Sequence, residues 1–360
     1  MERVRLVVVG AGLMGARHAE LVHENEMCSL VGICDADPSR RRVAQRFGVP
    51  FYPVAEELIE RERPDGAIIA TPNAQHARVA EQCARRSVHV LVEKPIADTI
   101  EQALRIARVS AECGTKVLVG HHRRHNPLVQ RTRDLVRGGS LGRLIGVSLL
   151  WTLLKPDEYF QVSWRSQPPG GGPLLINLIH ELDSLRFICG EIVEVYARTS
   201  SAARGLAVED SLSISLRFQN GALGTILASD ATPAPWSYEA TTAENPSYFH
   251  TGENCCFFLG TAASLAFPRM ELWRYPEGLA RGWKEPMERS NVRVAPADPL
   301  RIQLEHFCRI IRGEEEPLVD AGEGTKSLAV ALAVRESARE GMPVDPSTLF
   351  SCCIKVLGSP

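Results

Sequence analysis

Two residues of this sequence have the type and the setting for proton transfer, and the first is Lys94. It lies in a Glu93-Lys94-Pro95 step at the end of an apolar segment, 88–93, that is typical of a buried strand. Desolvation at the mouth of a ligand crevice would lower the pKa of such a lysine and suit it to acid–base chemistry. The alternative is a surface lysine at a strand end, which is a frequent arrangement.

The second candidate, His180, lies on an expected apolar helix that follows the glycine run 170–172. Asn177, His180 and Asp183 come at steps of three, so their side chains lie on nearly one face of that helix. Histidine is well suited to exchange a proton near neutral pH. A lone histidine on an apolar helix is more often a satisfied core residue, so the functional interpretation depends on the glycines and the polar neighbours.

The element that must position these groups is a glycine turn near the N-terminus. Residues 4–9 (VRLVVV) predict a strand buried on both faces, and GAGLMG follows at once. Gly10 allows a sharp bend, Gly12 leaves room for a pyrophosphate, and Gly15 lets the next helix pack close to the sheet. The N–H groups at the start of that helix would hold the phosphates. The pattern predicts a dinucleotide site, the alternative being a tight turn without a ligand.

The acid that ends the second strand, 29–34, indicates which dinucleotide binds. Asp35 lies 20 residues after Gly15, where a carboxylate can bind both ribose hydroxyls of an adenosine. Its charge repels the 2′-phosphate of NADP, so it favours NAD. The arginines at 40–42 could instead bind that phosphate, although they also fit the solvated first turn of the helix after 37–39. We therefore expect NAD rather than NADP.

Strands and helices continue to alternate as far as residue 120. Helices are expected at 39–47, 55–61, 74–86 and 100–113, and strands at 66–70, 88–93 and 116–120. Units of this length predict a doubly wound parallel sheet, whose ligands lie beyond the carboxyl ends of the strands. The polar groups that follow those ends are Thr71, Asn73, His76, Glu93, Lys94, His121, His122 and Arg123.

A different pattern follows and predicts a second domain. Strands are expected at 192–199, 210–218, 222–231, 257–267 and 270–275, with a hairpin signal at 220–221, and helices at 300–312 and 321–340. Segment 151–165 mixes aromatic and charged side chains, which suits a polyhydroxylated ligand, although an ordinary loop over buried tryptophans is the alternative. Its candidates are Trp151, Lys155, Asp157, Tyr159, Trp164 and Arg165. We expect domains at 1–123 and 124–345, the C-terminal helices packing back on the first, and a tail at 346–360.

Composition narrows the possible partners. The 360 residues carry a net charge of −2, so bulk charge gives no support to a nucleic-acid-binding surface. No apolar run approaches the ~18–20 residues that span a bilayer. The ten cysteines show neither a CxxC pair nor the Cys/His spacing of a zinc site. We therefore expect a cytoplasmic protein that binds a small molecule, with no metal, no nucleic acid and no membrane partner.

Four motifs in order resemble the Gfo/Idh/MocA oxidoreductases: GAGLMG, ATPNAQH at 70–76, HVLVEKPIA at 89–97 and GGGPLLINLIHELD at 170–183. The resemblance covers nearly the whole chain. It implies a Rossmann domain and then an α/β domain with a large, open-faced, mostly antiparallel sheet. The outer face of that sheet commonly forms the contact in such homodimers and homotetramers.

The resemblance also assigns roles to residues. Lys94 would match the lysine that contacts the reacting oxygen and the nicotinamide. The bond between this lysine and the following proline is often cis in the family. His180 would match the histidine that acts as the acid/base. The expected cofactor contacts are Gly10, Gly12, Leu13, Met14, Gly15, Asp35, Thr71, Asn73, His76, Glu93 and Lys94. The expected substrate contacts are Arg123, Trp164, Arg165, Asn177 and His180.

One position departs from the family pattern. Many inositol-dehydrogenase-like members carry an aspartate four residues before the histidine, where this chain has Ile176. Asn177 or Asp183 would then hold His180, or other groups would set its acid–base properties. The missing aspartate weakens the case for an inositol dehydrogenase specifically.

The expected reaction moves a hydride between nicotinamide and a hydroxyl or carbonyl carbon of a sugar, polyol or related cyclic alcohol. His180 would exchange the hydroxyl proton, and Lys94 would stabilise the developing negative charge on the oxygen. The alternatives are a reductase of a dihydrodiol, imine or keto compound, and a non-catalytic dinucleotide sensor. A sensor would be expected to lose the lysine or the histidine, and both are present.

Overall fold

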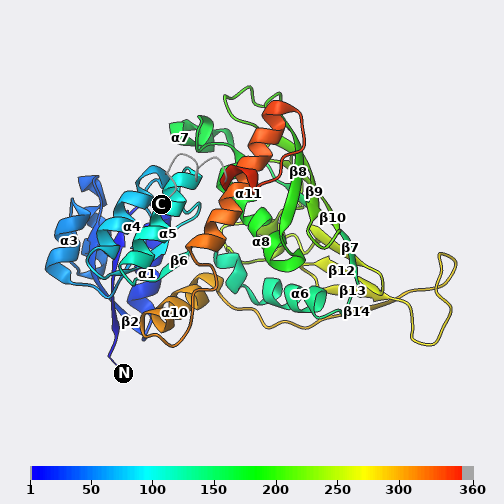
Figure 1. The fold of residues 1–360 in the computed structure, drawn as a ribbon, viewed down its shortest axis with the longest axis horizontal. Helices are drawn as coiled ribbons and strands as arrows, with labels where there is room; N and C mark the ends of the chain where they lie inside the picture. Colours follow the sequence, from blue (N-terminus) through cyan, green and yellow to red (C-terminus); the bar gives the residue numbers. More distant parts are fainter. Residues whose placement is uncertain (1, 351–360) are drawn as a thin grey trace. The chain divides into compact units, whose positions relative to one another are not determined.

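The computed structural model describes residues 2–350, which fall into two compact units (Figure 1). Among the described residues, unit 1 contains 2–122 together with 299–328, and unit 2 contains 123–298 together with 329–350. Helix α11 (Ala321–Glu340) contributes residues to both units.

Unit 1 is built on a six-stranded parallel sheet in the order β3-β2-β1-β4-β5-β6. Its elements, in chain order, are β1 (Val4–Val9), α1 (Leu13–Glu24), β2 (Cys28–Cys34), η1 (Pro38–Arg40), α2 (Arg41–Phe47), β3 (Phe51–Tyr52), α3 (Ala55–Glu62), β4 (Gly66–Ile69), η2 (Asn73–Gln75), α4 (His76–Ala84), β5 (His89–Val92), α5 (Ile100–Glu112), β6 (Val117–Val119) and α10 (Pro299–Ile311).

The central strands of unit 1 are mostly apolar because helices cover both faces of the sheet. Every residue of β4 is buried, and so are the last three of β5. The returning C-terminal segment is held at the β6 edge, where Val119 N donates to Val319 O over 2.8 Å and Lys116 pairs with Glu316. The core of this unit thus fixes the strand ends to which the candidate groups are attached.

Unit 2 is built on an eight-stranded sheet in the order β14-β13-β12-β11-β7-β10-β9-β8, antiparallel except for the pair β7 and β10. Its elements are η3 (His122–His125, which begins at the last residue of unit 1), α6 (Pro127–Arg137), β7 (Leu144–Thr152), η4 (Asp157–Gln161), α7 (Ser163–Ser166), η5 (Leu174–Leu178), α8 (Ile179–Cys189), β8 (Ile192–Ser200), β9 (Ser211–Phe218), β10 (Leu223–Ser229), α9 (Tyr238–Thr241), β11 (Cys256–Gly260), β12 (Ala263–Phe267), β13 (Glu271–Arg274) and β14 (Glu288–Asn291).

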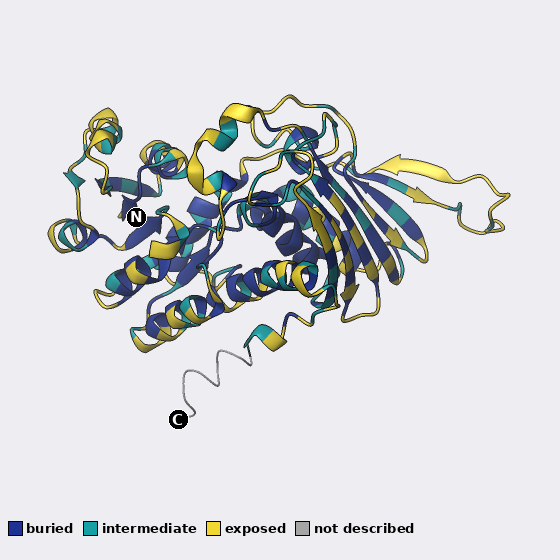
Figure 2. Cartoon of the chain, turned by 90° about the horizontal axis from the view of Figure 1, so that it is seen from above, coloured by how far each residue is buried: buried dark blue, intermediate teal, exposed yellow. Residues whose placement is uncertain are grey.

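This second sheet has one covered face and one open face. Buried and exposed residues alternate along β9 and β10, as Figure 2 shows by the alternating colours of the strands. Helix α8 is buried along its whole length, and Ser337 of α11 accepts a hydrogen bond from Ala197 N of β8. The open face exposes a group of large apolar side chains, namely Ile145, Leu223, Leu227, Phe257 and Leu259.

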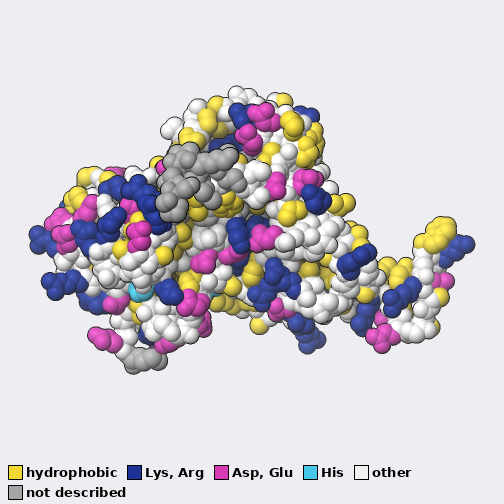
Figure 3. All heavy atoms as spheres, in the orientation of Figure 1, with side chains coloured by type: hydrophobic (Ala, Val, Ile, Leu, Met, Phe, Trp, Pro, Cys, Tyr) yellow, Lys and Arg dark blue, Asp and Glu magenta, His cyan; other side chains and the backbone are white. Residues whose placement is uncertain are grey.

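A long arm connects β13 to β14 and projects from the sheet of unit 2 (Figure 2). Leu279 and Trp283 lie on it and are strongly exposed, and apolar side chains gather at its far end in Figure 3. On the same face of the molecule, charged side chains of both signs are interspersed (Figure 3).

The doubly wound parallel sheet and the mostly antiparallel second sheet confirm the predicted fold class. The predicted strand at 257–267 is wrong in one respect, because β11 and β12 form a hairpin there with a turn after Gly260. The eight cysteines of the described residues are free thiols. Within 2–350, no helix is both long and apolar enough to cross a membrane.

Candidate active site

The three glycines of the first turn have different structural requirements. Gly10 has a φ of +94°, and a Cβ on Gly15 would lie 1.7 Å from Gly10 O, so the turn itself needs glycine at both positions. Gly12 has an ordinary φ of −68°, and a Cβ there would meet no atom within 4 Å. The open space in front of Gly12 is what a pyrophosphate would occupy.

Helix α1 begins directly after Gly12. Leu13 and Met14 form its first turn, with Leu13 strongly exposed. The backbone N–H groups of a first turn have no partner within the helix, and they carry the positive end of the helix dipole. This part of unit 1 therefore has the geometry of a phosphate site.

Asp35 lies at the end of β2 and is linked to the glycine turn. Its carboxylate accepts hydrogen bonds from Ala11 N over 2.6 Å and from Asp37 N over 2.8 Å. The neighbouring arginines are engaged by the chain itself: Arg40 pairs with Asp37 over 3.6 Å, and the Arg41 guanidinium lies 5.1 Å from the centre of the Phe51 ring. Two of the three arginines that could have bound a 2′-phosphate thus have other partners.

The loops after β4 and β5 are joined by His76. This histidine is buried, with Nδ1 3.0 Å from Pro95 O and Nε2 2.9 Å from Thr71 O. Burial lowers its pKa, against the opposing effect of the two carbonyl groups. His76 therefore supports the two loops from within, whereas the sequence places it among the groups that line the cofactor site.

Two further groups after β4 remain available to a ligand. Thr71 Oγ1 is buried and has no hydrogen-bond partner among the described residues, and Asn73 is half-buried at the start of η2. A buried hydroxyl without a partner is costly, so a bound ligand that satisfied it would gain free energy. With the open space at Gly12, these residues fit a dinucleotide.

The end of β5 carries a buried ion pair that the sequence did not reveal. His18 Nε2 of α1 lies 2.7 Å from Glu93 Oε1, and both residues are buried. Burial raises the pKa of Glu93, but the hydrogen bond to His18 and the charges of His18 and Lys94 outweigh it and lower the pKa to about 2. The Lys94–Pro95 bond that follows is cis, as the resemblance implies. His18 lies three residues after Gly15, on the face of α1 that packs on the sheet. This spacing is the feature of the sequence that could have indicated a contact between His18 and a strand end.

We predict that the His18–Glu93 pair makes the stability of the protein depend on pH. Since the pKa of Glu93 is lowered from 4.5 to about 2, its contribution is present above pH 4.5 and is lost as the pH falls towards 2. A Glu93→Gln variant should have a free energy of unfolding lower by roughly 3 kcal/mol at pH 7, and by progressively less as the pH falls. Urea unfolding of both proteins at a series of pH values measures this difference.

Glu316→Gln is the matched control for that series. The Glu316 side chain is 79% exposed and pairs with Lys116 at the surface, so its loss should change the free energy of unfolding by less than about 1 kcal/mol. A pH-independent difference between the wild type and Glu93→Gln would contradict the prediction.

The helix that bears His180 begins with one wide turn. Ile179 N donates to Leu174 O, five residues back, so η5 is a π-helical turn that leads into α8. Such turns occur often at functional sites. Glu209 accepts a hydrogen bond from Leu174 N over 3.0 Å, and a Cβ on Gly172 would lie 2.4 Å from Glu209 Oε1. Gly172, with a φ of +84°, therefore allows the carboxylate to reach the start of the helix.

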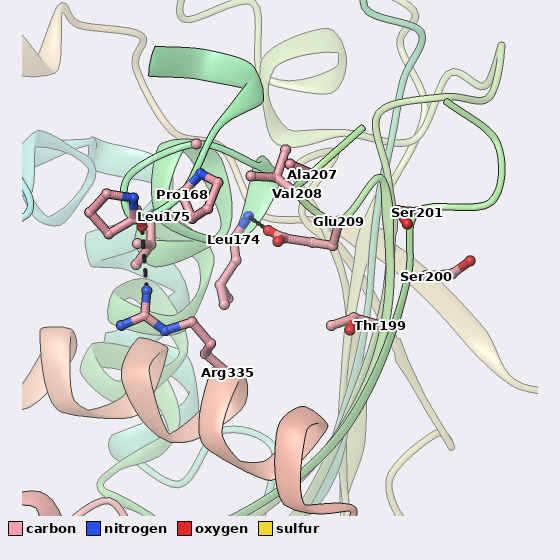
Figure 4. Close-up of a pocket in the computed structure, with 12 residues that line it drawn as sticks. Pro168, Leu174, Leu175, Thr199, Ser200, Ser201, Ala207, Val208, Glu209 and Arg335 are labelled. Carbon is pink, nitrogen blue, oxygen red and sulfur yellow. Dashed lines mark hydrogen bonds between the residues drawn. The ribbon is translucent and has the colours of Figure 1, made fainter. Parts of the chain in front are cut away.

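A cavity of about 340 Å³ lies beside this start within unit 2 (Figure 4). Glu209 points to Leu174 in the close-up, and Arg335 reaches from α11 to the Pro169 carbonyl over 3.3 Å. Burial raises the pKa of Glu209. Both charged groups thus hold the glycine loop in place.

The polar neighbours of His180 are held by cations. Asn177 Oδ1 accepts a hydrogen bond from Lys155 Nζ over 2.8 Å. Both carboxylate oxygens of Asp183 accept hydrogen bonds from Arg124, over 2.9 Å from Nε to Oδ2 and over 2.7 Å from Nη2 to Oδ1. His180 itself is buried on α8. Both residues expected to hold His180 in place of the family aspartate are therefore linked to basic residues.

Arg123, which was expected as a substrate contact, has carboxylate partners within unit 2. It is buried between the carboxylates of Glu181 and Glu239, and its guanidinium lies 3.7 Å from the centre of the Tyr238 ring. Burial raises the pKa of Glu181 to about 7, despite the opposing charge of Arg123. Arg123 thus belongs to an internal ion network.

The aromatic segment after β7 divides into a buried part and an exposed part. Trp151 is fully buried, and its Nε1 donates to Glu239 Oε2 over 2.9 Å, so it belongs to the core. Trp164 is exposed, and the Arg165 guanidinium lies 5.5 Å from its ring and 4.1 Å from that of Tyr159. Trp164 and Arg165 remain the accessible candidates in this segment.

The fold and these groups define a Rossmann-fold oxidoreductase with a separate sheet domain. Residues 4–121 match the model of the oxidoreductase family with an NAD-binding Rossmann fold, and residues 129–265 match that of the GFO/IDH/MocA C-terminal domain. The chain belongs to the Gfo/Idh/MocA family of oxidoreductases.

Named relatives extend this result. The chain is 28% identical over 376 residues to an inositol 2-dehydrogenase of Rubrobacter xylanophilus, covering 99% of each protein. It is 32% identical over 192 residues to the rhizopine catabolism protein MocA of Rhizobium meliloti, which spans 53% of this chain and 59% of that protein. An oxidoreductase from Agrobacterium radiobacter, solved with NAD+, L-tartaric acid and magnesium, has the same fold with a TM-score of 0.82 at 20% identity, over 97% of this chain and 100% of that one.

Proposed function

We propose that the protein transfers a hydride between NAD and a hydroxyl or carbonyl carbon of a sugar, a polyol or a related cyclic alcohol. The observation that carries this proposal is the buried His18–Glu93 pair, because it ties the first helix of the dinucleotide turn to the strand end that bears Lys94. Helix α1, which begins at the cofactor site, and the end of β5, which bears the candidate lysine, are thereby linked to each other. The name of the inositol 2-dehydrogenase that matches along its whole length supports the polyol class.

Each of the candidate residues would have its own role in this reaction. Bound nicotinamide supplies or accepts the hydride. His180 takes the proton of the substrate hydroxyl during oxidation and returns it during reduction. The ammonium of Lys94 stabilises the negative charge that develops on the substrate oxygen. The Glu93 carboxylate offsets part of the positive charge of that ammonium. The remaining proposed contacts are Thr71 and Asn73 for the cofactor, and Asn177, Trp164 and Arg165 for the substrate.

We further propose that the protein is a cytoplasmic homodimer or homotetramer. The open face of the unit 2 sheet supports this, since it exposes Ile145, Leu223, Leu227, Phe257 and Leu259 on neighbouring strands. Large exposed apolar side chains gathered on neighbouring strands are typical of a protein–protein contact.

We predict that NADH stabilises the protein more than NADPH does. Asp35 would bind the ribose hydroxyls of NADH and repel the 2′-phosphate of NADPH, while Arg40 and Arg41 are engaged by Asp37 and Phe51. A ligand at 100 times its dissociation constant adds about 2.7 kcal/mol to the free energy of unfolding. Melting temperatures measured over a series of NADH and NADPH concentrations give the comparison, and oxidation of a sugar and polyol panel with NAD follows.

A stronger effect of NADPH would overturn the choice of cofactor and favour reduction as the physiological direction. No effect of either nucleotide would overturn the dinucleotide site itself. Binding of NADH without turnover of any panel member would instead favour the sensor alternative.

A further inference from the structure

We propose that Lys155 is a positioning residue, which fixes the side-chain amide of Asn177 so that its NH2 group donates a hydrogen bond to an oxygen of the substrate. This inference rests on the proposed function, in which Asn177 contacts the substrate, and it adds the residue that determines how this contact is made. The hydrogen bonds that carry the inference all lie within unit 2.

Lys155 follows β7, and the fold holds both its backbone and its side chain. Its backbone N–H donates to Asp230 O over 2.9 Å, and its carbonyl accepts a hydrogen bond from Arg204 Nη2 over 2.7 Å. The residue is buried, and its ammonium lies 4.7 Å from the centre of the Tyr159 ring. Nζ donates to Asn177 Oδ1 over 2.8 Å. The ammonium therefore reaches Asn177 from a fixed point of the sheet domain.

The charge of Lys155 is balanced by the protein itself. Asp230 Oδ2 lies 3.3 Å from Lys155 Nζ, and Asp230 Oδ1 accepts a hydrogen bond from Arg204 Nε over 3.1 Å. Asp210 is a second buried carboxylate and accepts a hydrogen bond from Arg204 N over 2.9 Å. The two cations thus lie beside two buried carboxylates, so no ligand is needed to neutralise Lys155. What the ammonium supplies beyond this balance is the hydrogen bond to Asn177.

The bond from Lys155 determines which end of the Asn177 amide is presented to a ligand. An ammonium donates hydrogen bonds and accepts none, so the carbonyl oxygen of the amide must face Lys155 and the NH2 group must point away from it. This NH2 group belongs to a half-buried residue and donates no hydrogen bond within 2–350. The last side-chain bond of asparagine has two broad, roughly equivalent orientations. Lys155 thus selects the one in which two N–H donors are available to a substrate.

Asn177 lies on the helical run that bears the proposed acid/base. It belongs to η5, the wide turn that leads into α8, and it precedes His180 by three residues. The other four residues of this turn, whose sequence is LLINL, are leucine or isoleucine, so Asn177 supplies its polar side chain. A donor fixed here would bind an oxygen of the substrate beside the hydroxyl whose proton His180 exchanges. Lys155 would therefore act on the reaction through Asn177.

The test is a double-mutant cycle in which kcat and KM are measured separately. Myo-inositol, D-sorbitol, D-glucose and D-xylose are offered with NAD, and the compound that the wild type oxidises best is used for every variant. Asn177→Ala should lower kcat/KM by about 100-fold and Lys155→Met by about 30-fold. Both losses should lie mainly in KM, because the amide would bind the substrate before as well as during hydride transfer. In the Asn177→Ala background, Lys155→Met should lower kcat/KM by less than about threefold more.

Three further variants serve as controls. Lys155→Arg keeps a donor towards Asn177 and should retain kcat/KM within about fivefold of the wild type. Asn177→Asp keeps an acceptor for Lys155 but has no NH2 group, so it should lose as much as Asn177→Ala. The exposed Lys284→Met controls for the loss of one positive charge and should equal the wild type. Losses that multiply in the double variant would overturn the inference, since Lys155 would then act on the substrate directly. Wild-type kcat/KM in Asn177→Asp would also overturn it, and this result does not depend on the folding of Lys155→Met.

Failure of the proposed dehydrogenase activity gives a different result. If none of the four compounds is oxidised, isothermal titration of the NADH-bound wild type with each of them replaces the kinetics, and the same cycle is applied to the dissociation constants. Binding that follows the cycle upholds the role of Lys155 without the proposed reaction. Turnover in which the two losses multiply upholds the reaction and overturns the role of Lys155, and a wild type that binds none of the four compounds overturns the inference as well.

Discussion

Gly12→Ala is expected to abolish tight NAD binding while leaving the fold intact. A Cβ at this position meets no protein atom within 4 Å, and the φ of −68° is allowed for alanine. The added methyl group would instead occupy the space in front of the backbone where a pyrophosphate must lie. The dissociation constant for NADH should rise at least about 100-fold, equivalent to roughly 3 kcal/mol.

The stability of the same variant should change little. Replacement of glycine by alanine at an unstrained position alters the free energy of unfolding by about 1 kcal/mol or less. NADH binding measured by fluorescence and urea unfolding without nucleotide are the two required measurements. Unchanged NADH affinity in Gly12→Ala would show that the pyrophosphate does not lie against this turn.

Gly15→Ala provides the contrasting variant. Its Cβ would lie 1.7 Å from Gly10 O, so α1 could not remain against the sheet. This variant should lose both stability and NADH binding, whereas Gly12→Ala should lose only binding. The pair therefore separates the glycine that the fold requires from the one that the ligand requires.

Local patterns were sufficient to predict the elements around that turn. The strand, the glycine spacing and the acid that ends the second strand lie within one βαβ unit, and each depends on its immediate neighbours. The helix expected at 321–340 coincides with α11. The resemblance to the family supplied the open-faced second sheet.

Contacts distant in sequence were not predictable in this way. β7 lies in the middle of the second sheet and pairs in parallel with β10. Buried and exposed residues do not alternate cleanly along β7, so its pattern does not indicate a strand. Arg123 was expected at a ligand site, but its partners Glu181 and Glu239 come 58 and 116 residues later. His18 meets Glu93 across 75 residues. Such polar pairs follow from the packing of elements, which single-segment patterns do not specify.

Lys94→Ala should lower kcat by about 10²-fold or more, while the dissociation constant for NAD stays within about tenfold of the wild type. The ammonium would act on the oxygen of the reacting carbon, so its loss raises the barrier of the chemical step rather than weakening cofactor binding. Glu93 would keep its hydrogen bond to His18 in this variant, so the end of β5 should hold its position.

Lys116→Ala is the matched control, because this lysine lies in the same unit and pairs with Glu316 at the surface. Its kcat should equal that of the wild type. His180→Gln should lose turnover to a similar extent as Lys94→Ala, and if both residues act on one step, the double variant should lose far less than the product of the two single losses. Near-normal turnover in Lys94→Ala would remove the lysine from the chemistry, and it would leave His180 with the glycine loop before it as the centre of the reaction.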